Sequence, residues 1–69
     1  MYMSIKDIRL YASEGEALNF LELLQRARNR AEICLGWIMK AGVLKLNPED
    51  KTEKHIWSYG DKLVVLAED

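Results

Sequence analysis

Apolar and polar residues alternate between Ala31 and Pro48, and this period of two is typical of strands with one buried face. β-Branched and aromatic residues are well represented there, which suits a pleated sheet. Ala41-Gly42 supplies a tight turn, because glycine accepts the positive φ that hairpin turns need. The pattern predicts a hairpin whose second strand, Val43–Leu46, ends at Asn47-Pro48. In the first strand of this hairpin, alternate side chains point to opposite faces. One set is Ile33, Leu35, Trp37 and Met39, and the other is Glu32, Cys34, Gly36 and Ile38.

Earlier in the chain, a second alternating stretch predicts a first strand from Ser4 to Ala12. Such alternation fits an antiparallel sheet with one face in the core. The turn-forming run Ser13-Glu14-Gly15-Glu16 then breaks the pattern. On this reading one face of the strand carries Ile8, Leu10 and Ala12, and the other carries Asp7, Arg9 and Tyr11.

One amphipathic helix follows, because Phe20, Leu23, Leu24 and Ala27 recur at the spacing of a single helix face. Two starts have capping-box spacing, Ser13 with Glu16 and Asn19 with Glu22. The second is favoured, since Leu18 and Leu23 then occupy the hydrophobic-staple positions. Cations suit the negative end of a helix, so we expect the stop near Arg28-Asn29-Arg30, after about three turns.

The C-terminal run Leu63-Val64-Val65-Leu66 is continuously apolar, which marks a strand buried on both faces and therefore central in its sheet. Gly60-Asp61 is a turn signal before it. His55–Tyr59 is ambiguous between a brief strand and an approach turn, and Glu49–Lys54 is a charged loop. The order β-α-β-β-loop-β predicts an α+β fold, a small sandwich of one helix on a mixed or antiparallel sheet, as a single domain over residues 1–69.

Composition narrows the class of protein. A chain of 69 residues has a small core, and its one cysteine permits no internal disulfide, so oligomerisation is the expected supplement to stability. The net charge of −1 gives no basic bias toward nucleic acid. No apolar run reaches the roughly 18 residues of a membrane helix, and no signal peptide is recognisable. We therefore expect a cytoplasmic segment without direct membrane insertion, and its abrupt end after an apolar run suggests a module of a longer protein.

Few residues offer chemistry. Cys34 and His55 form a conceivable nucleophile pair, but no orienting third group is recognisable, and a cysteine in an apolar strand is usually a core residue. No metal-ligand spacing occurs, and the acids Glu49, Asp50 and Glu53 lack the pattern of a calcium loop. A solvated surface is favoured over a basic ligand patch formed by Arg26, Arg28, Arg30, Lys40 and Lys45. An enzyme is therefore the least supported class.

Trp37 and Trp57 carry the most surface to bury. In so small a domain one of them is a candidate for exposure, and an exposed tryptophan among apolar side chains commonly marks an interface. The sequence is equally consistent with a homodimer surface at a tryptophan and with complete burial of both rings.

The order of elements resembles the C-terminal lobe of RCK domains, also called TrkA-C, which regulates potassium channels and transporters from the cytosolic side. The resemblance covers residues 17–69, and no G-x-G-x-x-G of the RCK nucleotide-binding lobe occurs. Several pieces look closest to the Castor/Pollux-related ion channel branch. The matching motifs are Leu18–Leu23 at the helix start, Ala31–Trp37 in the strand, Asn47-Pro48 with Lys51-Thr52-Glu53, and Gly60–Ala67 at the end.

This resemblance implies a regulatory domain without cofactor that forms a homodimer and serves a pore or transporter subunit. It also implies a regulatory small ligand bound between paired lobes, which biases their pairing. On this hypothesis Phe20 and Trp37 anchor the dimer interface, while Lys40 and Asn47 contact the ligand. Two alternatives stay open, a winged-helix-like nucleic-acid-binding domain, which requires two further helices, and an interaction module with no ligand.

Overall fold

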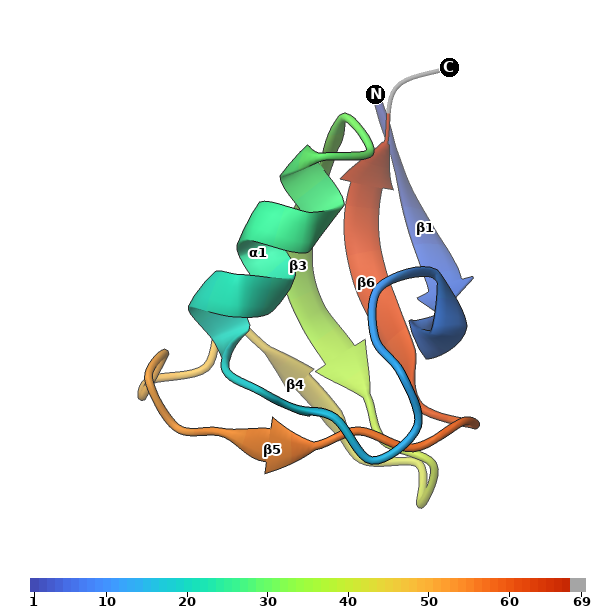
Figure 1. The fold of residues 1–69 in the computed structure, drawn as a ribbon. Coiled ribbons are helices and arrows are strands. Elements are labelled where there is room, and N and C mark those ends of the chain that lie inside the picture. Colours follow the sequence, from blue (N-terminus) through green and yellow to red (C-terminus); the bar gives the residue numbers. More distant parts are fainter. Residues whose placement is uncertain (68–69) are drawn as a thin grey trace.

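A four-stranded antiparallel sheet with one α-helix on one of its faces forms the body of the domain (Figure 1). The computed structural model describes residues 1–67, and its sheet has the strand order β1-β6-β3-β4. Strands β2 and β5 form a separate antiparallel pair. The α+β prediction is thereby confirmed. The elements are β1 (Tyr2–Asp7), the 3-10 turn η1 (Ile8–Leu10), β2 (Ala17–Leu18), α1 (Phe20–Arg28), β3 (Glu32–Ile38), β4 (Leu44–Leu46), β5 (His55–Ile56) and β6 (Lys62–Ala67).

Strand β6 lies between β1 and β3 and pairs with both along its whole length. Leu63 and Val65 face the helix and are completely buried. Val64, on the opposite face, is 4% exposed. The apolar run therefore forms a central strand, as its sequence predicts, with Val64 buried on the far side and Leu66 only partly buried there.

Strand β3 contains a β-bulge that the period of two did not reveal. The register against β6 shifts between Cys34 and Gly36, so Cys34 and Trp37 both end on the buried side. Ile33 points to the other face and is 43% exposed. The prediction that Ile33 shares a face with Trp37 is therefore wrong, because the extra residue of a bulge reverses the alternation.

The first strand ends earlier than predicted. A carboxylate oxygen of Asp7 accepts the Arg9 backbone N–H at 2.9 Å and starts the 3-10 turn η1. This turn buries Ile8 and Tyr11 and leaves Leu10 47% exposed. The predicted strand is wrong beyond Asp7, because a local side-chain hydrogen bond offers the backbone an alternative to the ladder.

The helix begins where the second capping box places it. The Asn19 side chain accepts the Glu22 backbone N–H at 2.8 Å, and the Glu22 carboxylate accepts the Asn19 backbone N–H at 3.0 Å. Leu18 and Leu23 are buried beside this start. The helix ends with Asn29 as its C-cap, and Ala31 then takes a positive φ of 60° before β3.

Both tryptophans lie in the core, and Trp57 directly follows β5, which crosses the lower end of the molecule in Figure 1. Their rings meet edge to face, with centroids 5.2 Å apart. The Trp57 indole N–H donates to the Leu18 carbonyl oxygen at 3.2 Å. Trp37 is 3% exposed and Trp57 1%, so the alternative of a partly exposed tryptophan is wrong for this chain.

Gly36 permits the close approach of β4 to β3. A Cβ at this position would lie 2.0 Å from the Lys45 carbonyl oxygen and 2.8 Å from the Leu46 Cα. We expect Gly36→Ala to destabilise the domain by about 1–3 kcal/mol, because backbone atoms of β4 must move. Urea denaturation followed by tryptophan fluorescence measures the change. The control Gly15→Asn should cost less, since the Cβ of Gly15 would meet no atom within 4 Å and asparagine tolerates its φ of 78°.

Candidate functional site

A cavity of about 410 Å³ opens between the β3–β4 hairpin and residues 48–55. Its inner wall is aromatic, since the rings of Trp37 and His55 lie against each other with centroids 5.1 Å apart. Val43 just before β4, Lys45 on β4 and residues of the following loop complete it. The lining comprises Trp37, Met39, Val43, Lys45, Pro48, Glu49, Asp50, Glu53 and His55.

The cavity rim is predominantly acidic. Glu49, Asp50 and Glu53 contribute three carboxylates, against the single ammonium of Lys45. The Glu53 carboxylate lies 3.3 Å from the His55 Nε2. Hydrogen bonds from the Thr52 hydroxyl and backbone N–H lower the pKa of Asp50, so this carboxylate is ionised at neutral pH. The site therefore offers an apolar interior and a negative mouth.

Metal binding finds no support in this geometry. Within residues 1–67, no three histidine, cysteine, aspartate or glutamate side chains lie close enough together to hold a metal ion. In the same part of the chain, no helix has the length and apolar character that crossing a membrane requires.

The two predicted ligand contacts, Lys40 and Asn47, lie outside the cavity lining. Along the chain, Lys40 precedes β4 and Asn47 follows it. The Lys40 backbone N–H donates to the buried carboxylate of Asp61 at 2.7 Å. Asn47 has a φ of 47° and donates its backbone N–H to the Leu35 carbonyl oxygen at 2.9 Å. Their role as ligand contacts stays a prediction. The cation that does line the cavity is Lys45, which pairs with Trp37 across the hairpin.

Phe20 and Trp37, the predicted dimer anchors, are 5% and 3% exposed and pack against each other with centroids 6.0 Å apart. Their surface is already covered within the chain. Contact with a second copy through them stays a prediction, but the apolar surface that the chain leaves free lies elsewhere.

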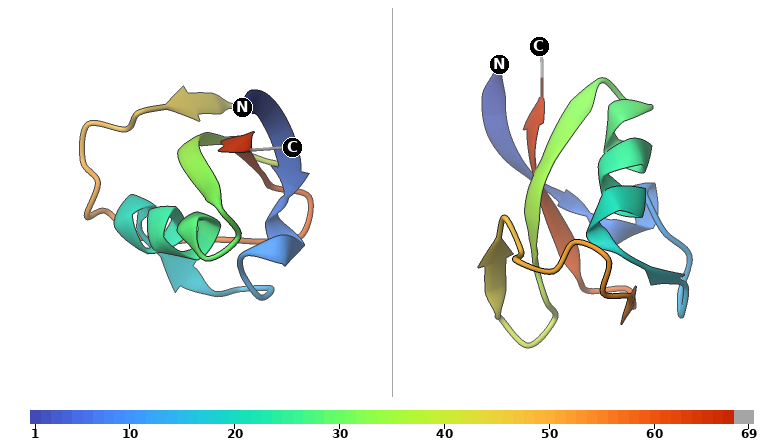
Figure 2. Two further views of the ribbon diagram at one scale, coloured as in Figure 1. Left: turned by 90° about the horizontal axis from the view of Figure 1, so that it is seen from above. Right: turned by 90° about the vertical axis from the view of Figure 1, so that its left-hand side faces the viewer.

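That free surface is the side of the main sheet opposite α1, here called the open face. In the right-hand view of Figure 2 the helix lies on one side of the sheet only. Cross-strand pairs place Met3 beside Leu66, and Leu66 beside Ile33. The side chains that are more than two-fifths exposed on this face are Met3, Ile5, Ile33, Leu44 and Leu46.

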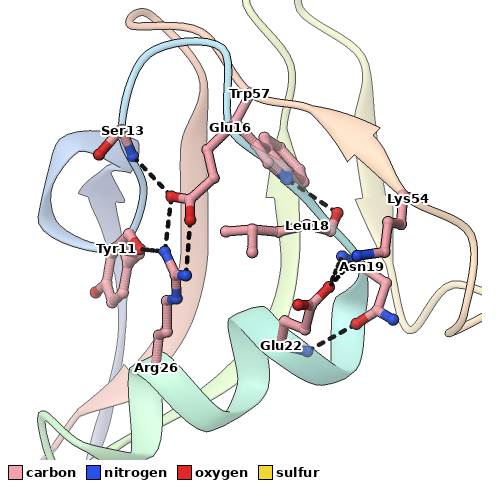
Figure 3. A network of polar contacts seen from close by, with 9 residues as sticks. All are labelled: Tyr11, Ser13, Glu16, Leu18, Asn19, Glu22, Arg26, Lys54 and Trp57. Atoms are coloured by element: carbon pink, nitrogen blue, oxygen red, sulfur yellow. Dashed lines mark hydrogen bonds and ion pairs between the residues drawn. The ribbon is translucent and has the colours of Figure 1, made fainter.

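Arg26, from the predicted basic patch, is committed to the fold (Figure 3). Its guanidinium donates two hydrogen bonds of 2.8 Å to the Glu16 carboxylate and one of 2.7 Å to the Tyr11 carbonyl oxygen. The Ser13 backbone N–H also donates to Glu16, at 3.0 Å. These contacts tie the segment before the helix to its last turn. Arg26 is thus a structural cation, as the favoured reading of the patch requires.

Cys34 is 3% exposed, and burial raises the pKa of its thiol to about 11. A thiol that stays protonated at neutral pH is a poor nucleophile. The packing contacts of His55 are instead with Trp37 and Trp57. The core reading of Cys34 thereby gains a physical basis.

The chain is similar to ion channels of plants. Over 67 residues, 96% of its length, it is 40% identical to the probable ion channel CASTOR of Oryza sativa subsp. japonica. It is 39% identical, over 96%, to the ion channel CASTOR of Lotus japonicus, and 35% identical, over 94%, to the probable ion channel POLLUX of Oryza sativa subsp. japonica. The chain spans 8% of the length of both CASTOR proteins and 7% of the POLLUX protein. No family model matches it.

The domain is therefore of a kind that ion channels contain. More particularly, its sequence is related to a segment of the CASTOR and POLLUX channels. This relationship confirms the predicted resemblance to the Castor/Pollux-related branch and fits the C-terminal lobe of an RCK domain.

Burial should make Cys34 inert in the native state. A rise of the thiol pKa from 9.0 to about 11 lowers the thiolate fraction near neutral pH about a hundredfold. We expect Ellman's reagent at pH 8 to react at least that much more slowly with native than with urea-unfolded protein. Equal rates in the two states would contradict the core position of this thiol.

Acid should weaken the Glu16–Arg26 pair. The Arg26 guanidinium, helped by the Ser13 backbone N–H, lowers the pKa of Glu16 to about 2. A carboxylate with a lowered pKa stabilises the fold above its unfolded value near 4.5, and this contribution disappears as the pH falls toward 2. Melting temperatures between pH 5 and about 2 should therefore fall less steeply for Glu16→Gln than for the wild type. The control Glu14→Gln, which leaves the pair intact, should keep the steeper fall.

Proposed function

We propose that the domain is a cytosolic, non-catalytic regulatory lobe of a potassium or other cation channel or transporter. It pairs with a second copy through the open face and senses a ligand in the cavity. The open face carries the pairing proposal, because an antiparallel sheet with one free side usually turns polar residues to water. The sequence similarity to CASTOR and POLLUX channels supports the assignment to a channel.

The area of the open face suits an interface of ordinary size. Its most exposed side chains show between 43% and 64% of their surface, which amounts to an apolar patch on the order of 500 Å², near the upper end for single chains. A typical interface buries about 800 Å² per partner, roughly 60% of it non-polar. The patch thus supplies about the apolar area that one partner contributes.

Charge also favours an identical partner over a charged one. Strands β1 and β6 place Asp7 opposite Lys62 at one end of the open face, and apolar residues occupy the rows beyond them. Asp7 also pairs with the Arg9 guanidinium at 3.1 Å, so these charges gather at one end, and the apolar rows of a second open face meet no charge. A two-fold arrangement is the commonest way for one chain to use the same patch twice.

The structure removes the main support for the nucleic-acid alternative. A winged-helix-like domain needs three helices, whereas residues 1–67 contain one α-helix and the short turn η1. The arginine of the basic patch that is best placed on the helix, Arg26, is occupied by Glu16. The ligand-free interaction module remains as the second candidate, and the cavity distinguishes it from a sensor.

A charge placed on the open face should separate the pair. We expect Ile5→Glu to weaken self-association at least tenfold by sedimentation equilibrium, because the two-fold brings like charges together. The matched control is Leu21→Glu, which changes a side chain exposed to a similar extent on the helix. A wild-type chain that stays monomeric at millimolar concentration would overturn the pairing proposal, as would equal weakening by both variants.

A further inference from the structure

The cavity beside β4 combines an aromatic and aliphatic interior with an acidic mouth. We propose that it binds an organic cation with an apolar stem, namely an alkylammonium group such as a lysine side chain or a free diamine carries. This inference names the ligand class of the sensor proposed above. It depends on the cavity alone and not on pairing through the open face.

The interior fits the stem of such a cation. Met39, Val43 and Pro48 provide aliphatic contacts beside the Trp37 ring, and the cavity volume of about 410 Å³ suits a small organic group. A hydrated metal ion would gain nothing from this wall. An alkyl chain of a few carbons is stabilised by each methylene that it buries against this wall.

The mouth fits the positive end. Glu49, Asp50 and Glu53 carry three negative charges, and Lys45 and Lys51, whose ammonium donates to the Pro48 carbonyl oxygen at 2.9 Å, carry two positive ones. The mouth therefore keeps a net charge of −1, which favours a cation over a carboxylate or a phosphate. Asp50 is held by Thr52, and Glu53 lies beside His55, so both carboxylates have defined positions. The His55 side chain is 30% exposed and lies against the largely covered Trp37 ring, so a ligand in the cavity meets mainly the imidazole on this wall.

For a cationic ligand, the ammonium of Lys45 on β4 should weaken binding. Lys45 belongs to the cavity lining, and its ammonium is the charge that opposes a cationic ligand. Lysine has a flexible stem and is strongly hydrated, so it can turn toward water when a ligand enters. Removal of this ammonium should therefore improve binding, whereas removal of a rim carboxylate should impair it.

The direct test titrates the intact 69-residue chain with 1,5-diaminopentane and with Nα-acetyl-lysine methylamide. The readouts are the NMR shift of the Trp37 indole N–H and calorimetry at low salt. Two probes serve as controls, pentanoate with a similar stem and a negative charge, and tetramethylammonium with a charge and no stem. We expect both amines to bind and both control probes to bind at least fivefold more weakly. Tighter binding of the lysine amide points to a protein segment as the source of the cation, and tighter binding of the diamine to a free amine.

Three variants sharpen the result. Glu49→Gln and Glu53→Gln should each weaken amine binding about two- to fivefold, the usual range for an exposed ion pair, and Lys45→Gln should strengthen it by a similar factor. Glu14→Gln, a change of an exposed acid outside the cavity lining, should leave binding unchanged. Thermal melting of each variant shows that the fold is retained.

The proposal is overturned if pentanoate binds as tightly as the amines, if neither amine shifts the Trp37 signal, or if the rim variants bind like Glu14→Gln. These outcomes are separate from the fate of the pairing proposal, because sedimentation of the same samples reports self-association independently.

Discussion

The pairing of β6 with strands on both of its sides is the constraint on which the rest of the domain depends. Its pairing with β1 brings the first and last strands together, since Tyr2 pairs with Ala67, and its pairing with β3 adds the middle of the chain, since Glu32 also pairs with Ala67. Leu63 and Val65 are buried on the side of the sheet that carries α1, which packs mainly against β3, whereas Val64 belongs to the other side of the sheet. A strand that is apolar on both faces needs cover on both faces, and α1 covers only one.

Several elements were predictable because their signals are local. The helix start follows from Asn19, Glu22 and the apolar pair around them, all within a few residues. The turn at Gly42 follows from glycine's tolerance of a positive φ, which is 92° here. The central strand follows from an unbroken apolar run. In these places the residue types and the final packing favour the same conformation, so a reading of the sequence succeeds.

Other features depend on tertiary contacts and left no clear mark in the sequence. The bulge in β3 requires knowledge of the register against β6, and the end of β1 requires the Asp7 side chain to choose the backbone N–H of Arg9. Ser13 and Glu16 form half of a capping contact without a helix, because Arg26 draws the Glu16 carboxylate toward the core. Ser13 and Glu16 have capping-box spacing, but no helix begins there.

The candidate site divides in the same way. The acids of the loop and the lysines near the hairpin are visible in the sequence. Lys40 and Asn47 lie outside the cavity lining and their ligand contact stays a prediction, whereas Lys45 lines the cavity. The pairing of Trp37 with Lys45 depends on a three-residue hairpin loop, Lys40 to Gly42, closed by the Met39 N–H donating to the Val43 carbonyl oxygen. The predicted two-residue turn at Ala41-Gly42 would pair Trp37 with Leu46 instead, so the sequence-based prediction misses this register by one residue. The burial of both tryptophans was harder to foresee, because it depends on the β2–β5 pair, whose strands have two residues each.

Strand β4 is an edge strand with different surroundings on its two sides. Val43 and Lys45 border the cavity, while Leu44 and Leu46 between and after them belong to the open face. In the proposed function, ligand binding on one side of β4 and pairing on the other would both act on this one short strand, so the two binding events would be linked. By linkage, the factor by which a bound ligand raises the affinity of two copies for each other equals the factor by which dimerisation raises the affinity for the ligand.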